Sequence, residues 1–279
     1  MLLYTNNVYP HPYELLISND KLCSNQETID YIIVTPTRPS EYLFRDVIRR
    51  TWGMNRSYQG LHIRHVFIMG VEIGSYWTTE QLLEEQHLYG DLVQYDYVNS
   101  FFNSTVQSLL GMQWVTEHCS NAKYYIKANT DTYVNIEAVH HALMKTLSEF
   151  SFHDIAAGSI IASNAPIRYM TPYYCPPLCF QRDYFYPYLQ GSFYVFSYPT
   201  MKRILEASKT IVPRTHLEDI YFSIVMHDLN IQLLNPFKFT ELTEETNKNE
   251  MIPYMSTFDA VHHVDPYKIL KIHGILHSK

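Results

Sequence analysis

The sequence predicts an α/β fold, a single mixed and mostly parallel sheet flanked by helices. Short runs rich in β-branched and aromatic residues alternate along the first half of the chain with longer helical patterns. Strands that alternate with helices favour parallel pairs joined by crossovers. With 279 residues, of which 46% are hydrophobic, the chain can bury a full core. We expect residues 1–27 to form a polar lead-in and residues 28–279 to form one domain.

The first strand and the first helix have clear local signals. Residues 30–36 form a β-branched run that Pro36 stops, which predicts a buried strand. Residues 40–52 follow with helical spacing, and Ser40 is a suitable N-cap. One face of this helix is expected to carry the apolar residues Leu43, Val47 and Ile48.

The following segments repeat the alternation. Residues 65–70 predict a second strand that ends in glycine. Residues 78–89 predict a polar helix closed by Gly90, and residues 91–96 predict a third strand that ends in a carboxylate. A helix over residues 103–118 and a strand over residues 123–128 complete the first half.

The second half is less regular. Residues 163–190 are rich in Pro and Tyr and predict a long loop. A strand is expected over residues 191–197, and helices are expected over residues 198–208 and 215–230. The last 40 residues are mixed and contain the pair His262–His263.

Charge and hydropathy exclude some classes of protein. The formal net charge is −7 and no run of Lys and Arg is present, so we expect no nucleic-acid partner. The sequence contains no 18-residue apolar run, and residues 1–13 lack the basic start and apolar core of a signal peptide. We therefore expect a soluble protein or a chain whose membrane anchor lies upstream.

The four cysteines favour an oxidising compartment. They form no Cys-x-x-Cys pair and show no zinc-ligand spacing. Their even number, together with possible glycosylation sites at Asn55 and Asn103, favours the secretory pathway. The sequence leaves the disulfide pairing open: Cys175 with Cys179 is geometrically easy, and Cys23 with Cys119 is the remaining option.

Asp131 is the strongest candidate for a ligand site. It follows the apolar run Tyr124–Ile126, and a carboxylate at the end of a buried strand is destabilising unless it is paired or binds a cation. Strand ends of an α/β sheet are also where ligands bind. We therefore expect Asp131 to hold a divalent cation and, through it, a phosphate. The alternative is an Asp that bonds its own backbone in a turn.

Two further groups have both a functional and a purely structural interpretation. Glu218 and Asp219 enter a helix, where acids complement the helix dipole, but either could deprotonate an attacking hydroxyl. His262 or His263 could bind a metal, because imidazole with carboxylate suits Mn²⁺, or could be an ordinary surface or core residue.

Two arginines raise the same question. Arg45 and Arg49 lie near the end of the first predicted helix and could pair with a phosphate. The alternative is that they pair with nearby acids such as Asp46.

These segments occur together in one order, and that order resembles the galactosyltransferase-type β-1,3-glycosyltransferase family. The match covers roughly residues 10–270 and is most specific at Arg-x-x-Ile-Arg-x-Thr-Trp-Gly. The matching segments are His11–Ile17, Arg45–Gly53, Phe67–Gly70, Tyr89–Asp96, Asn103–Thr105, Lys127–Asn135, Tyr186–Gly191 and Glu218–Ile220.

The resemblance implies a GT-A type fold that binds a nucleotide sugar, most often UDP-galactose or UDP-N-acetylglucosamine. It implies an inverting reaction, dependent on Mn²⁺ with Mg²⁺ as an alternative, that makes a β-1,3 linkage to a glycan on a glycoprotein or glycolipid. Family members are type II membrane proteins of the Golgi. The resemblance therefore implies the Golgi lumen if an anchor precedes this chain, and otherwise a soluble form in the secretory pathway.

The resemblance also assigns roles to residues. Asp131 corresponds to the metal-binding Asp of the Asp-x-Asp motif, His263 is the preferred histidine ligand, and His262 is the alternative. Asp219 corresponds to the catalytic base, with Glu218 beside it. The residues expected on the donor side are Thr35, Arg38, Arg45, Arg49, Asn129, Thr130 and Asp131.

The sequence departs from the family pattern inside these motifs. Three changes remove a charge, and Asn129 in place of the first Asp lies nearest to the expected metal. The departures are Asn99, Gln107, Asn129, Gln190 and Ser223. The preferred hypothesis is an active glycosyltransferase. The alternative is a weak or inactive pseudoenzyme that binds a sugar nucleotide or glycan on the same fold, and a fringe-like enzyme is a third option with the same chemistry.

Overall fold

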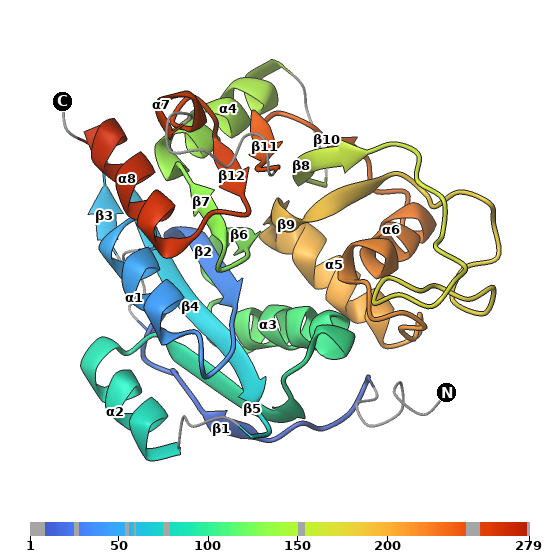
Figure 1. Ribbon diagram of the computed structural model, residues 1–279, viewed down its shortest axis with the longest axis horizontal. Coiled ribbons are helices and arrows are strands. Elements are labelled where there is room, and N and C mark those ends of the chain that lie inside the picture. Colours follow the sequence, from blue (N-terminus) through green and yellow to red (C-terminus); the bar gives the residue numbers. More distant parts are fainter. Residues whose placement is uncertain are drawn as a thin grey trace.

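The computed structural model describes residues 9–24, 28–53, 56–58, 60–74, 79–149, 154–243 and 252–277. Within these residues a nine-stranded sheet forms the centre of the molecule (Figure 1). Its strands lie in the order β1 (Leu15–Ile17), β5 (Leu92–Val98), β4 (Leu61–Val71), β2 (Ile29–Pro36), β6 (Ala122–Ala128), β9 (Tyr188–Ser197), β8 (Ala156–Ile161) and β10 (Leu233–Leu234). The ninth strand, β3 (Arg56–Tyr58), pairs with β4.

The sheet has a parallel centre and antiparallel additions. The strands β5, β4, β2 and β6 are parallel neighbours, whereas β9 is antiparallel to both β6 and β8. The predicted α/β architecture, a mixed sheet with a parallel centre and flanking helices, is therefore confirmed. The residues expected to form a lead-in contribute β1, which pairs with β5. The division into a lead-in and one domain stays a prediction.

Helices cover both faces of the sheet (Figure 1). Ile33 of β2 packs in a cluster with Val47 and Ile269, whereas its neighbour Val34 packs with Leu109 on the other face. This alternation follows from the pleat of a strand buried on both sides. The first face carries α1 (Tyr42–Arg50), α4 (Ile136–Glu149) and α8 (Pro266–His277), and the second carries α3 (Ser104–His118), α5 (Tyr198–Ser208) and α6 (Glu218–Asp228). The remaining helices are α2 (Thr79–Tyr89), α7 (Ile252–Met255) and the 3₁₀ turn η1 (Phe101–Asn103).

A second, smaller sheet joins distant parts of the chain. It contains β11 (Phe239–Glu241), β12 (Ala260–His262) and β7 (Thr132–Val134), in that order. The antiparallel pairing of β12 with β7 places His262 opposite Thr132. The backbone N–H of Val264 then donates to the carbonyl of Asp131 at 2.9 Å. This sheet brings the end of the domain beside the strand that precedes α4.

Several element boundaries differ from the prediction. β4 begins at Leu61 rather than at residue 65, because its first residues pair with β3, and such pairing leaves no local signal. β9 begins at Tyr188, so it takes residues 188–190 from the predicted loop. α6 begins at Glu218 rather than at residue 215, since the carbonyl of Thr215 accepts a bond from the Thr105 hydroxyl at 3.1 Å. The helix α4 and the strand β8 have no counterpart in the prediction.

The predicted details of the first helix are partly wrong. Glu41, rather than Ser40, occupies the N-cap position of α1. The Ser40 hydroxyl instead donates to Glu72 at 2.9 Å. Val47 and Ile48 are buried as expected, but Leu43 is 61% exposed. The helical spacing marked the correct face for two of the three residues, and Leu43 lies at its solvent edge.

Both cysteine pairings that the sequence left open are present as disulfides, Cys23–Cys119 and Cys175–Cys179. Of the two glycosylation candidates, Asn55 lies outside the described residues. The Asn103 amide donates to the Val98 carbonyl at 2.7 Å. A glycan on Asn103 would disturb this bond. None of the described helices is long and apolar enough to span a membrane.

The two disulfides are expected to differ in their effect on stability. Cys23–Cys119 spans 96 residues of sequence, whereas Cys175–Cys179 spans only 4. Loop-closure entropy then predicts that Cys23→Ser with Cys119→Ser lowers the free energy of unfolding by about 5 kcal/mol, against about 2 kcal/mol for the shorter loop. Denaturant unfolding of both double variants measures this difference. Equal losses would show that strain or local packing, rather than chain entropy, determines the contribution.

Candidate functional site

A cavity of about 800 Å³ opens where the parallel strands end. Pro36 at the end of β2, Asn99 after β5 and Asn129 after β6 all line it. Carboxyl ends of parallel strands are the usual ligand position in α/β sheets. The cavity wall contains eight of the predicted site residues, namely Arg38, Asn129, Thr130, Asp131, Glu218, Asp219, His262 and His263. These residues come from four separate segments of the chain, which the fold brings together.

Asp131 and the two histidines form a candidate metal centre. One ligand atom of each residue lies within 4.8 Å of the ligand atoms of the other two. Nε2 of His262 lies 3.2 Å from Asp131 Oδ1, and Nδ1 of His263 lies 3.5 Å from Asp131 Oδ2. One carboxylate and two imidazoles fit a divalent transition ion and leave further positions for ligand oxygens. The structure brings both histidines to Asp131, so the choice between His262 and His263 stays open.

Glu241 orients the buried histidine of this centre. Its carboxylate lies 2.9 Å from Nδ1 of His262, on the opposite side of the ring from Asp131. Both carboxylates can only accept, so the ring satisfies both of them when both of its nitrogens carry a proton. With a cation at Nε2, the remaining proton would lie on Nδ1 and face Glu241. A carboxylate behind a ligating histidine is the usual support in metal sites. Sequence reasoning missed Glu241, because nothing near it in the chain marks its role.

In the candidate metal centre, Asp131 and His262 each favour the charged form of the other. Burial raises the pKa of Asp131, but the bond to His262 and the charges of both imidazoles outweigh this and hold that pKa below its ordinary value. Burial lowers the pKa of His262, but Asp131 and Glu241 outweigh it and raise the net value. Asp131 is therefore ionised at neutral pH. A bound cation would take the place of the proton shared with His262.

Asp219 and Glu218 have different environments, although they are adjacent. Glu218 is buried, accepts a hydrogen bond from the Tyr194 hydroxyl at 2.7 Å, and lies 3.3 Å from Nζ of Lys127. The Lys127 ammonium also donates to the carbonyl of Gly191. Asp219 accepts a bond from the Ile220 N–H at 2.8 Å and lines the cavity. Glu218 thus belongs to a buried network, whereas Asp219 is available to a ligand.

The environment of Asp219 suits a general base. Burial raises the pKa of its carboxyl to about 6, and the neighbouring Glu218 adds to the rise. A base whose pKa lies near the working pH is ionised yet able to accept a proton. Lys127 belongs to one of the motif segments, and a lysine inside an apolar strand is a signal for a buried carboxylate partner.

Three predicted donor-side residues do not line the cavity. Arg45 is fully buried and binds Glu85 at 2.7 Å, and Arg49 binds both Glu85 and Asp91, at 2.6 and 2.7 Å. These pairs satisfy the arginines with acids, as the structural alternative proposed. The acids are Glu85 and Asp91, which are distant in the chain, rather than the neighbouring Asp46. Thr35 lies 2.9 Å from His65 Nε2 in the sheet. The geometry gives no support to direct donor contacts by Thr35, Arg45 or Arg49.

Arg45 nevertheless supports the wall of the cavity indirectly. Its guanidinium donates to the carbonyl groups of Arg38 and Pro39, and so holds the loop after β2 that lines the cavity. Gln107, one of the departures from the family pattern, holds the same loop by donating to the Thr37 carbonyl at 3.2 Å. The loop is therefore fixed by buried side chains.

The other departures also have identifiable contacts. Asn99 accepts from the Gly70 N–H at 2.8 Å, and Gln190 donates to the Glu241 carboxylate. Ser223 donates to the Ile220 carbonyl within α6 at 2.7 Å. Asn129 lines the cavity beside Asp131. Of these residues, Gln190 is connected to the metal centre, through Glu241 and His262.

Comparison with known proteins gives the family. Residues 44–236 match the galactosyltransferase family over more than half of the chain. The chain belongs to the galactosyltransferase family. The motif order in the sequence and the mixed, mostly parallel α/β sheet agree with this membership.

Two beta-1,3-galactosyltransferases are among the relatives of this galactosyltransferase-family chain. It is 29% identical to beta-1,3-galactosyltransferase 2 of Pongo abelii over 82% of its own length and 54% of that protein. It is 27% identical to beta-1,3-galactosyltransferase 1 of Mus musculus, over 99% of its own length and 82% of that protein. The chain thus spans about half the length of the first of these relatives.

Solved structures resemble the chain only loosely. The galactosyltransferase LgtC in complex with donor and acceptor sugar analogues has a TM-score of 0.47 and 8% identity, over 88% of this chain and 95% of that one. Mouse xyloside xylosyltransferase 1 has a TM-score of 0.38 and 10% identity, over 84% of this chain and 97% of that one. These scores are too low to support an argument about function.

The support of His262 by Glu241 can be tested by metal binding alone. Glu241→Ala is expected to weaken Mn²⁺ binding by about tenfold or more, because the ring loses the group that fixes its orientation. Titration calorimetry with MnCl₂ measures the change. The control is Glu206→Ala, since Glu206 is an exposed carboxylate of α5 whose partner is Lys209. Equal affinity of the Glu241 variant and the wild type would contradict the assignment.

The raised pKa of Asp219 predicts a pH-dependent gain in stability on substitution. A carboxyl whose pKa is higher in the folded state favours folding at low pH, and this contribution is lost as pH rises through about 6. Asp219→Asn should therefore increase the free energy of unfolding by about 1–3 kcal/mol at pH 8 and by much less near pH 4. Urea unfolding at the two pH values measures this. A difference that does not change with pH would contradict the raised pKa.

Proposed function

We propose that this chain is an inverting hexosyltransferase that moves galactose from UDP-galactose to a glycan hydroxyl in β-1,3 linkage. The observation that carries the proposal is that a candidate metal centre and a carboxylate with a raised pKa line one cavity. The printed names of the relatives, beta-1,3-galactosyltransferases 1 and 2, support the choice of sugar and linkage. UDP-N-acetylglucosamine is the second donor candidate.

The charge of the cavity supports a need for a cation. Among its described lining residues, five are carboxylates and two are cationic. The carboxylates are Glu41, Asp131, Glu218, Asp219 and Glu241, and the cationic residues are Arg38 and Lys127. A diphosphate would be repelled by this excess of negative charge unless a metal ion accompanied it. Asp131 with His262 and His263 would hold that ion, for which we propose Mn²⁺, and when bound it would neutralise the departing diphosphate.

Residues on two walls of the cavity then have different roles in the reaction. Asp219 accepts the proton of the acceptor hydroxyl as the hydroxyl oxygen bonds to the anomeric carbon. The bond from that carbon to the diphosphate breaks, and UDP leaves on the side of Asp131. Glu218 and Lys127 keep the entry of α6 in place through their buried ion pair. The loop with Arg38, together with Asn129 and Thr130, is the proposed donor side.

Membership in the family also suggests the domain extent, the acceptor and the cellular location. We propose residues 28–279 as one catalytic domain, with a glycan acceptor on a glycoprotein or glycolipid and the Golgi lumen as its location. The two disulfides support an oxidising compartment.

Transfer with purified protein tests the proposal. Wild-type protein with UDP-galactose, Mn²⁺ and an N-acetylglucosamine-terminated acceptor is expected to form a β-1,3-linked product. Asp219→Asn should lower kcat by about 10²–10⁴-fold, since the base is lost. The wild-type rate should fall as pH drops below about 6, because Asp219 becomes protonated. The matched control is Asp183→Asn, since Asp183 is an exposed loop carboxylate that does not line the cavity.

The pseudoenzyme hypothesis predicts a different result. Asn129, which lies beside the metal centre without a charge, is the observation that favours it. In that case UDP and Mn²⁺ bind, but no product forms with any donor in a panel of UDP-sugars. Transfer that is unaffected by Asp219→Asn would contradict the assignment of the base.

A further inference from the structure

Two aromatic rings form an exposed wall of the cavity beside the entry of α6. Phe101, in the turn after β5, and Tyr173, in the loop that precedes β9, both line the cavity. Their ring centroids are 5.4 Å apart at an interplanar angle of 79°. Phe101 is 37% exposed and Tyr173 is 56% exposed. We call this pair the aromatic rim.

His216 fixes both rings of the aromatic rim from behind. Its ring is buried and lies 5.2 Å from the ring of Phe101. Its Nε2 donates to the carbonyl of Pro172 at 2.7 Å, which holds the residue next to Tyr173. The Ser104 hydroxyl in turn donates to the carbonyl of His216. The rim is therefore connected to the first turn of α3 and to the chain that leads into α6.

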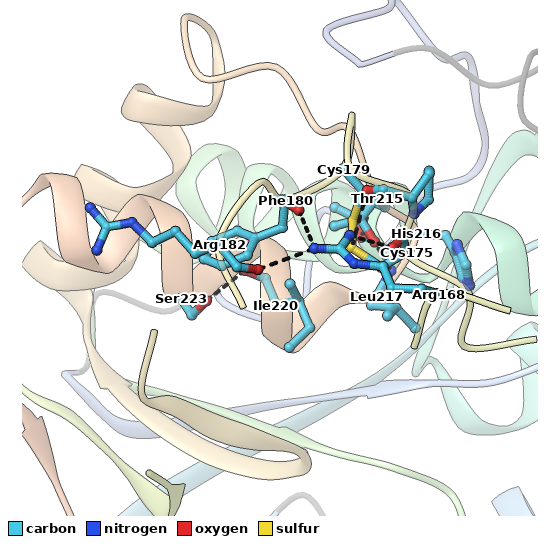
Figure 2. The surroundings of a disulfide bond; sticks show 12 residues. Arg168, Cys175, Cys179, Phe180, Arg182, Thr215, His216, Leu217, Ile220 and Ser223 are labelled. Carbon is cyan, nitrogen blue, oxygen red and sulfur yellow. Dashed lines mark hydrogen bonds between the residues drawn. A yellow bond between two sulfur atoms is a disulfide. The ribbon is translucent and has the colours of Figure 1, made fainter. Parts of the chain in front are cut away.

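The loop that carries Tyr173 is cross-linked near this point by a disulfide and by hydrogen bonds. Cys175 and Cys179 form a disulfide that packs on Leu217 and Ile220 at the start of α6 (Figure 2). The Arg168 guanidinium spans the loop and donates to three backbone carbonyls at 2.7–3.1 Å (Figure 2). These acceptors are Cys175, Phe180 and Arg182. Tyr173 is thus presented on a loop that is already ordered, which lowers the entropy lost when a ligand binds.

We propose that the aromatic rim binds a pyranose ring of the acceptor, a deeper assignment that rests on the proposed transferase function. An apolar ring face with a hydroxyl at its edge suits the apolar face and hydroxyl rim of a sugar. The rim lies beside the helix that carries Asp219, because the ring of Phe101 contacts His216 just before that helix begins and because Asp219 lines the same cavity. The acceptor must lie on the side of the base, whereas the donor lies on the side of the metal centre. The structure therefore assigns the rim to the acceptor rather than to the nucleobase of UDP.

Binding of simple sugars tests the subsite without relying on catalysis. The probes are methyl β-N-acetylglucosaminide and methyl β-galactoside, whose affinity is measured by ligand-observed NMR in the presence of UDP and Mg²⁺. At least one is expected to bind, and Tyr173→Ala should weaken that binding about tenfold, the effect of losing one stacked ring. Tyr173→Phe should keep most of the affinity. UDP affinity should be the same in all variants.

The control is Tyr169→Ala, because Tyr169 lies in the same loop and is 69% exposed but does not line the cavity. It should bind both sugars as the wild type does. Thermal melting shows whether each variant is folded, and Phe101→Ala is a second variant of the rim. The proposal is overturned if neither sugar binds the wild type, if both rim variants bind sugar normally, or if they weaken UDP instead. Sugar binding without any transfer would refute the proposed function and leave the subsite standing.

Discussion

The antiparallel pairing of β7 with β12 is the constraint on which the site depends. It joins residues 132–134 to residues 260–262, far apart in the chain. The bond from the Val264 N–H to the Asp131 carbonyl, at 2.9 Å, extends this pairing to the residues that flank the ladder. Because the pairing fixes the backbone, Asp131 meets both histidines without any movement of a loop. Preorganised ligands of this kind lose little entropy when they bind a cation.

The pKa values of two carboxylates in one cavity are shifted in opposite directions. Asp131 has two imidazoles beside it, and its pKa is lowered. Burial and the charge of the adjacent Glu218 raise the pKa of Asp219 to about 6. Pairs of acids whose environments separate their pKa values have different chemical roles. The separation here matches an electrostatic role for Asp131 and proton transfer by Asp219, with Lys127 compensating the charge of Glu218 behind them.

The sequence identified the parts that have local or motif signals and missed those that depend on long-range contacts. The parallel strands and the position of Asp131 follow from apolar runs and strand ends, whereas the choice of Asp219 as the base came from the family resemblance. Glu241 could not be found, because its role arises only when β11 pairs with β12. The partners that the sequence suggested for Arg45 and Arg49 were wrong for the same reason. Glu85 lies 40 residues from Arg45 in the chain, beyond the reach of any local pattern.

We propose that Asp131 and the neighbouring histidines form the metal centre of a sugar-nucleotide site. A crystal structure of the protein grown with Mn²⁺ and UDP tests it most directly, with anomalous scattering used to locate the metal. We predict one manganese ion bonded to Asp131 and to at least one of His262 and His263, with diphosphate oxygens completing its coordination. A manganese ion at another position in the cavity, or UDP bound with no metal beside Asp131, would contradict it.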